Sequence, residues 1–156
     1  MTFIFELPNI DLAFSLIVPF KLALATLLGM SIGRERKQNE KPGGTRTFGL
    51  VCLGACLIAI LSLELLKGNY TFDFARLLAY GIAGIGFLGS GVIIKNNNKV
   101  EGVTTASSLF ILMPIGFCIG LGYYTIAIMT GAFVYLILES NKIKVKKRKK
   151  KNVNKT

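Results

Sequence analysis

Two short segments of this sequence combine glycine, threonine and arginine in a pattern typical of anion binding. Residues Gly43–Thr47 read Gly-Gly-Thr-Arg-Thr, and residues Gly102–Thr105 read Gly-Val-Thr-Thr. Each segment precedes an apolar run, so we expect each to begin a helix with threonine caps and free backbone N–H groups. Helix starts of this kind attract anions. The guanidinium group of Arg46 would add a positive charge and paired N–H donors for the anion. The pattern predicts a site for a phosphate-bearing ligand or a lipid headgroup, with simple capping and topogenic charge as the alternative. The candidate residues are Glu35, Arg36, Arg46, Thr47, Thr104 and Thr105.

A second group of charged residues lies within or beside the apolar runs. Lys21 is well inside the first run, and a charge inside a membrane is a functional hypothesis by default. Snorkelling to the outer interface, eased by Pro19, is the alternative. We expect Glu64 to be the partner of Lys21. Asp73 and Arg76 flank the start of the third run. We expect Arg76 to form a structural ion pair with Asp73 or Glu64 rather than a ligand site.

Glycines recur at helical spacing. Residues Gly84–Gly89 match the dinucleotide-binding pattern G-x-G-x-x-G, but the strand and the βαβ context that this pattern requires are missing. We therefore interpret the glycines as surfaces for close helix packing in a membrane. The packing residues that we single out are Gly29, Gly33, Gly84, Gly86, Gly89 and Gly91.

The sequence offers little for catalysis or metal binding. It has no histidine, and none of its acidic residues lies deep in an apolar run. Cys52 and Cys56 share a helix face, but two thiols without histidine do not complete a metal site. With no nucleophile–base pair or metal constellation in view, we expect no enzyme activity, no bound metal and no cofactor.

The elements that position these residues are apolar runs, and a little over half of the chain is hydrophobic. Runs of this length cross a bilayer core of about 30 Å as helices. We predict an all-α, multi-pass membrane bundle with about five transmembrane helices. Their predicted ranges are Leu12–Gly33, Thr47–Leu66, Phe74–Ile94, Val103–Leu121 and Tyr123–Leu138.

Basic residues fix the expected orientation. They concentrate between the first and second helices, between the third and fourth, and after Glu139. The positive-inside bias therefore predicts a cytoplasmic C-terminus and an external N-terminus. We divide the chain into a transmembrane domain, residues 1–140, and a disordered polybasic tail, residues 141–156. The tail should bind anionic lipid at about 1 kcal/mol per basic residue, and we do not expect nucleic-acid binding.

A weak repeat relates residues 25–47 to residues 83–105, so that Ala25 and Gly33 fall on Ala83 and Gly91. Each unit is a small-residue helix, a basic loop and a Gly-x-x-Thr segment that leads into another helix. Parallel repeats of this kind occur in membrane proteins. Duplication and convergence of two similar hairpins both remain open.

Four segments together resemble the MgtC/SapB family of bacterial membrane proteins. They are LLGMSIGRER (Leu27–Arg36), PGGTRTFGLVCLGA (Pro42–Ala55), ARLLAYGIAGIGFLGSGVI (Ala75–Ile93) and EGVTTASSLF (Glu101–Phe110). The resemblance implies a multi-pass protein of the bacterial plasma membrane, associated with growth at low magnesium and with virulence. Many members carry a cytoplasmic C-terminal domain after the helices, which we do not expect in this chain. The family's recurrent polar positions would fall on Glu35, Arg36, Arg46, Thr47, Arg76, Thr104 and Thr105.

Two functions remain in view. The first, which the resemblance favours, is a non-enzymatic regulator that modulates a membrane complex or magnesium-linked ion homeostasis. It would pack its glycine faces against a membrane-protein partner or against its own copies, and present the Arg36 and Arg46 face to an anion. The second is a transporter or channel component, with Lys21 lining the path of an ion or small solute.

Overall fold

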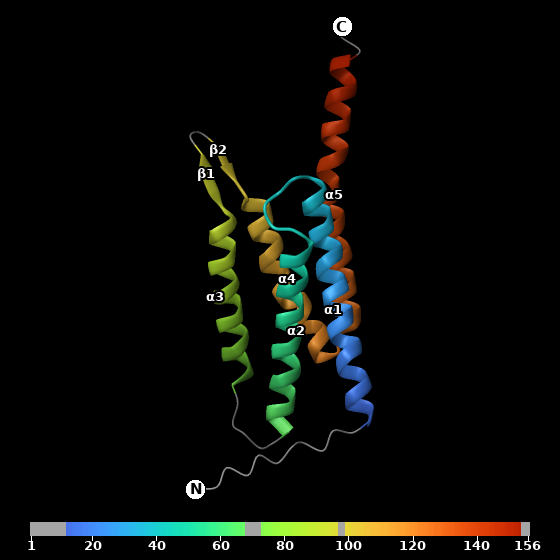
Figure 1. Cartoon of the computed structure of the whole chain (residues 1–156), viewed down its shortest axis with the longest axis vertical. Helices are drawn as coiled ribbons and strands as arrows, with labels where there is room; N and C mark the ends of the chain where they lie inside the picture. Colours follow the sequence, from blue (N-terminus) through green and yellow to red (C-terminus); the bar gives the residue numbers. More distant parts are fainter. Residues whose placement is uncertain (1–11, 68–72, 97–98, 154–156) are drawn as a thin grey trace.

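The computed structural model describes residues 12–67, 73–96 and 99–153, without the side chains of residues 12–14, 67, 74, 96 and 141–153. Five helices and one short hairpin make up this part of the chain. In order they are α1 (Leu12–Gln38), α2 (Thr45–Lys67), α3 (Phe74–Val92), β1 (Ile94–Asn96), β2 (Lys99–Glu101), α4 (Val103–Leu121) and α5 (Tyr124–Val153). The helices run alternately up and down, roughly side by side (Figure 1).

The bundle is built around α2 and α4. Helices α1 and α5 cover one side of this pair, whereas α3 stands on the other side and has its main contacts with α4 (Figure 1). The core between the helices holds apolar side chains that are almost completely buried, including Phe48, Cys52, Leu109, Leu112 and Ile115. Helix α3 thus packs mainly on one helix, whereas α1 packs on α2, α4 and α5.

Glycines allow α2 to approach both α1 and α4 closely. A Cβ atom at Gly33 would lie 2.7 Å from Cβ of Phe48 and 2.9 Å from the carbonyl oxygen of Gly44. A Cβ at Gly116 would lie 2.5 Å from the carbonyl oxygen of Cys52. Only residues without a side chain fit at such distances, which is how small residues hold helices together in lipid. Gly29 and Gly120 meet α2 in the same way.

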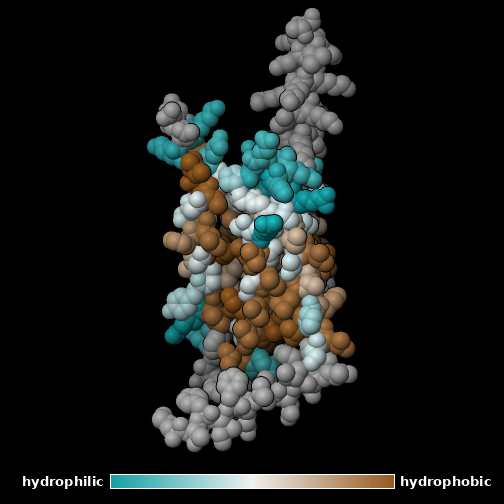
Figure 2. Space-filling model, viewed as in Figure 1, coloured by the Kyte–Doolittle hydropathy of each residue, from teal (hydrophilic) through white to brown (hydrophobic). Residues whose placement is uncertain are grey.

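The surface of the bundle is suited to a bilayer. Four helical stretches are long and apolar enough to cross a membrane, namely Ser15–Gln38, Thr45–Leu66, Ala75–Val92 and Val103–Leu121. The apolar part of α5, Tyr124–Ser140, is shorter, so a fifth crossing stays a prediction. Figure 2 shows a belt of apolar side chains across the visible face of the bundle and hydrophilic side chains gathered at the end that carries β1 and β2, here called the hairpin end. Because a bilayer would cover this belt, the chain is a multi-pass membrane protein.

The predicted all-α bundle is confirmed, with three local differences. Helix α1 continues beyond Gly33 to Gln38, since its charged last turn still has good helix-forming residues. The loop after α3 forms an antiparallel hairpin that pairs Ile94 with Glu101 and Lys95 with Val100. Helix α5 continues to Val153, where the sequence analysis places a disordered tail.

The hairpin end holds both basic loops and the C-terminal part of α5 (Figure 1). This shared location agrees with the predicted arrangement of loops, but the side that faces the cytoplasm stays a prediction. Lipid binding by the tail also stays a prediction, because its side chains lie outside the described residues.

Candidate functional site

A buried charged cluster closes the hairpin end of α1. Glu35 and Arg36 are only 2% and 4% exposed, although charged residues are rarely buried unless they are paired. Nε of Arg36 donates a hydrogen bond to Oε2 of Glu35. Nδ2 of Asn39 donates to Oε1 of Glu35 at 2.5 Å and to the carbonyl oxygen of Glu35 at 2.9 Å. Both carboxylate oxygens are therefore satisfied, and the pair is held rigidly.

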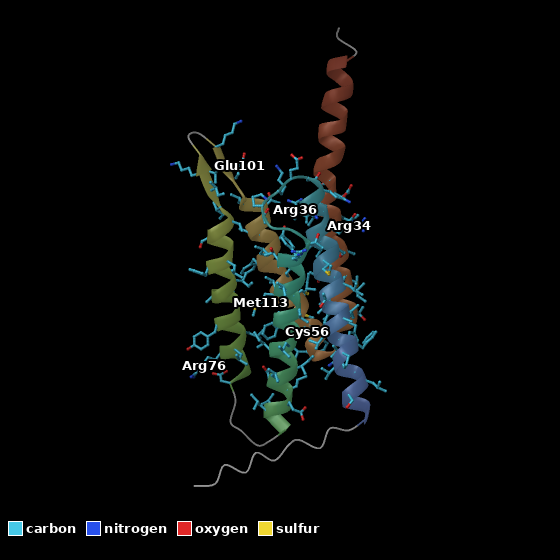
Figure 3. The ribbon with its side chains drawn as sticks, in the orientation of Figure 1. Arg34, Arg36, Cys56, Arg76, Glu101 and Met113 are labelled. Carbon is cyan, nitrogen blue, oxygen red and sulfur yellow. The ribbon has the colours of Figure 1, made fainter. Side chains whose placement is uncertain are left out.

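The loop after α1 lies against both this cluster and the start of α4. The amide of Lys41 donates to the carbonyl oxygen of Arg36 at 3.1 Å, which fixes Arg36 beside the loop (Figure 3). Gly43 then takes a φ of +75°, a left-handed conformation that favours glycine. A Cβ at Gly43 would lie 3.1 Å from both Phe48 and Thr105. The start of α2 and the start of α4 therefore meet here.

The structure brings together only part of the predicted anion site. Thr105 is 1% exposed, like the buried Glu35 and Arg36, and it lies beside Gly43 in the loop between α1 and α2. Arg46, Thr47 and Thr104 are exposed instead. Three of the six candidate residues are therefore buried and three are exposed, and the anion site stays a prediction. The sequence analysis missed Asn39, although its i,i+4 spacing from Glu35 is a recognisable signal for a side-chain pair.

The predicted threonine cap of α4 is wrong. The N-cap of α4 is Gly102, with a φ of +89° and no side-chain hydrogen bond. Glycine stands there because a Cβ would collide with the backbone of Val92. The first backbone N–H groups of α4 consequently have no side-chain cap at their N-cap residue, and such groups are orphan donors at a helix start.

At the opposite end of the bundle, Lys21 is held inside. Its Nζ donates a hydrogen bond to the carbonyl oxygen of Gly120 at 2.7 Å. Glu64, the predicted partner, lines the same pocket as Lys21, but the hydrogen bond described for Lys21 goes to α4. The ammonium group therefore neutralises the negative end of the α4 dipole.

Asp73 and Arg76 form the predicted ion pair at the start of α3. Oδ1 of Asp73 accepts a hydrogen bond from the Arg76 amide at 3.2 Å and caps the helix. Nε of Arg76 lies 3.5 Å from Oδ2 of Asp73. Both side chains are more than half exposed, so the pair contributes little to stability. Figure 3 shows Arg76 at the end of the bundle far from Arg36.

The packing glycines fall into two groups. Gly29 and Gly33 lie tightly against α2. A Cβ atom at Gly89 would lie 3.5 Å from Cβ of Ala106 on α4, which is an ordinary contact distance. By contrast, a Cβ at Gly84, Gly86 or Gly91 would meet nothing within 4 Å. Among the described residues, these three glycines have no close packing partner. Their predicted role in helix packing could therefore apply only to contact with another molecule, and it stays a prediction.

Comparison with known proteins identifies the family. Residues 22–147 match the model of the MgtC family. The chain is 34% identical to protein SapB of Bacillus subtilis, over 76% of this chain and 54% of SapB. It is 33% identical to the putative magnesium transporter YhiD of Escherichia coli, over 76% of this chain and 58% of YhiD. It is 37% identical to protein MgtC of Salmonella typhimurium, over 70% of this chain and 46% of MgtC.

The chain thus spans about half the length of these three relatives. No solved structure matches it, so the family rests on the sequence comparisons. The matched region contains α2, α3, α4, the buried cluster and most of α1. Since the family match covers well over half of the sequence, the chain belongs to the MgtC family.

Proposed function

We propose that this chain is a non-enzymatic membrane protein of magnesium homeostasis that works by binding and modulating another membrane protein. The link to magnesium rests on its relatives, one of which is named a putative magnesium transporter. Because the chain spans about half of these relatives' length, their activities are proposals for it. The binding role is supported by one observation in the structure, the bare face of α3.

That face is a stripe of five small residues at helical spacing, here called the small stripe. Each of its members is exposed: Ala75, Ala79, Ala83, Gly86 and Ser90. Lipid tails are as apolar as side chains, so membrane helices associate through close packing of small residues rather than through a hydrophobic drive. A small stripe that the described part of the chain leaves exposed is therefore suited to a helix from another molecule.

The repeat in the sequence indicates what kind of occupant fits. In α1, Ala25 is fully buried and Gly33 packs against the start of α2. Their counterparts in α3, Ala83 and Gly91, are both exposed. The positions that receive a helix in the first unit are thus vacant in the second. We take the occupant to be a transmembrane helix of a partner membrane protein.

We expect an anion to bind at the hairpin end. A guanidinium group has five N–H donors, and the side-chain hydrogen bond that the described residues give to Arg36 uses Nε. The starts of α2 and α4 meet at the same end of the bundle, around Gly43 and Thr105, and helix dipoles favour negative charge at such starts. A phosphate or an anionic headgroup is the ligand that this combination fits best.

The proposal is tested by lengthening one residue of the small stripe. Gly86 is exposed, and a Cβ there would meet nothing within 4 Å among the described residues, so we expect the Gly86→Leu protein to insert and fold normally. It should nevertheless lose support of growth at low magnesium and lose co-purification of a stoichiometric membrane protein. Ala132→Leu, at an exposed position of α5, is the matched control and should keep both. Normal growth and unchanged co-purification with Gly86→Leu would refute a role for this face.

Transport is the second candidate. It is favoured by the held ammonium group of Lys21 within the bundle and by the name of the YhiD relative. In sealed vesicles, a magnesium flux that disappears with Lys21→Leu would support it. The regulator proposal expects no flux with either the wild type or the variant.

A further inference from the structure

Lys21 of α1 lines a pocket of the bundle. It has a volume of about 420 Å³ and lies between α1, α2 and the end of α4. Its walls are mostly aliphatic, with Ile17, Val18, Ile60 and Leu63 among the lining residues. Two charged side chains of opposite sign, Lys21 and Glu64, line the same space. Pockets of this size and apolar character hold small ligands or parts of lipids.

Packing fixes the ammonium group at this position. Gly120 lies against Ala59 and Cys56 of α2, so closely that a Cβ would be 2.5 Å from Cβ of Ala59. This approach places the Gly120 carbonyl within 2.7 Å of Nζ of Lys21 on α1. An ammonium group has three donors, and the hydrogen bond to Gly120 uses one of them. Lys21 can therefore donate to a ligand without giving up its place in the fold.

The charges in the pocket limit the class of ligand. Glu64 has an interaction of its own, but a carboxylate has about four acceptor positions and can bind a second donor. A simple anion would be attracted by Lys21 and repelled by Glu64. A simple cation would be attracted by Glu64 and repelled by Lys21. A group that joins an oxyanion to a primary ammonium satisfies both side chains at once.

We propose that this pocket binds the headgroup of a zwitterionic aminophospholipid, such as phosphatidylethanolamine. The phosphate would accept from Lys21, and the ammonium would donate to Glu64. The aliphatic walls and the position within the membrane-spanning part of the bundle favour a lipid over a soluble zwitterion. The bound lipid would brace the junction of α1, α2 and α4. This inference is independent of the function proposed above.

Native mass spectrometry of the full chain in mild detergent tests the proposal. The probes are phosphatidylethanolamine, phosphatidylcholine and phosphatidylglycerol with identical acyl chains. Wild-type protein should retain phosphatidylethanolamine about ten-fold better than the other two, as expected for one charge-assisted hydrogen bond. Phosphatidylcholine is the sharpest comparison, because its quaternary ammonium cannot donate to Glu64. Equal retention of the three lipids by the wild type would overturn the proposal.

Variants separate the roles of the two charges. Lys21→Met should abolish the preference, whereas Lys95→Met, which removes the same charge from the exposed hairpin, should keep it. Glu64→Gln should switch the preference towards anionic phosphatidylglycerol, because the pocket then carries only the lysine charge. This switch keeps the proposal testable even if Lys21→Met fails to fold. A preference that survives both substitutions would refute it.

A competition experiment identifies the source of the headgroup. Glycerophosphoethanolamine carries the same charges without acyl chains. If the pocket binds a membrane lipid, this soluble compound should displace phosphatidylethanolamine only weakly. Displacement at equal concentration would show that a soluble zwitterion suffices and would overturn the assignment to a lipid.

Discussion

Two glycines on different helices should respond in opposite ways to the addition of one methyl group. A Cβ at Gly33 would stand 2.7 Å from Cβ of Phe48, 2.9 Å from the Gly44 carbonyl oxygen and 2.9 Å from Cα of Thr45. Backbone atoms cannot rotate away, so Gly33→Ala must push α1 and α2 apart. A Cβ at Gly86 would meet nothing within 4 Å, so Gly86→Ala leaves the packing unchanged.

The difference between the two variants isolates the packing energy. Both changes replace a glycine within a helix by alanine, so the gain in helix propensity, up to about 1 kcal/mol in water, largely cancels between them. What remains is the overpacking at Gly33, which costs about 1–3 kcal/mol. We therefore expect Gly33→Ala to unfold more easily than Gly86→Ala by about 1–3 kcal/mol.

The measurement is unfolding of the purified protein by titration with sodium dodecyl sulfate in mixed micelles, followed by circular dichroism. Gly116→Ala and Gly84→Ala supply a second matched pair, because Gly116 packs on α2 and Gly84 is bare. Equal stability within either pair, or the opposite order, would show that the packing described here is not the one that holds the bundle together.

Two further predictions use the same titration. Arg36→Gln should destabilise the protein by about 3 kcal/mol, because it leaves the Glu35 carboxylate buried without its charged partner. Its control, Arg34→Gln at an exposed position, should change stability by less than about 0.5 kcal/mol. Gly122 joins α4 to α5 with a φ of +91° and open space around it, so Gly122→Ala should cost about 1 kcal/mol and Gly122→Asn less.

Both predictions can fail clearly. If Arg36→Gln leaves the stability of the protein unchanged, the buried pair does not organise the hairpin end. If Gly122→Ala leaves the stability unchanged, the α4–α5 connection does not hold its left-handed conformation in solution.

The helices were predictable because apolar length is a direct physical requirement of a bilayer. The close packing of Gly29 and Gly33 on α2 was predictable for a related reason, since small residues at a spacing of four form a continuous surface. The hairpin was harder to foresee. Its strands have three residues each, too few to show the alternating pattern on which strand prediction depends.

The partners of charged residues were predictable only when they lie close in the sequence. Asp73 and Arg76 are three positions apart, and their pairing follows from helix geometry. Lys21 instead donates to a backbone carbonyl on α4. Every residue has such an acceptor, so no side-chain pattern marks Gly120 as the partner. The close approach of α4 to α2 decides the contact, and that is a property of the tertiary structure.

The orientation of α3 also could not be read from the sequence. The helix carries small residues on more than one face, and lipid does not distinguish those faces as water would. In the structure, Gly81 faces Met113 and Phe117 of α4, and Met113 points towards α3 (Figure 3). Because the face of α3 that carries Gly81 packs on α4, the small stripe is exposed.

We propose that the exposed small stripe of α3 receives a helix of another membrane protein. Site-specific photo-cross-linking in living cells tests it most directly, with a photoreactive residue at Ala79, Ala83 or Ser90 and control positions at Leu88 and Ala132. We predict a discrete cross-linked membrane protein from the three stripe positions alone, and its loss in the Gly86→Leu background. A product that contains only a second copy of this chain, or cross-links to lipid alone from every position, would contradict the account.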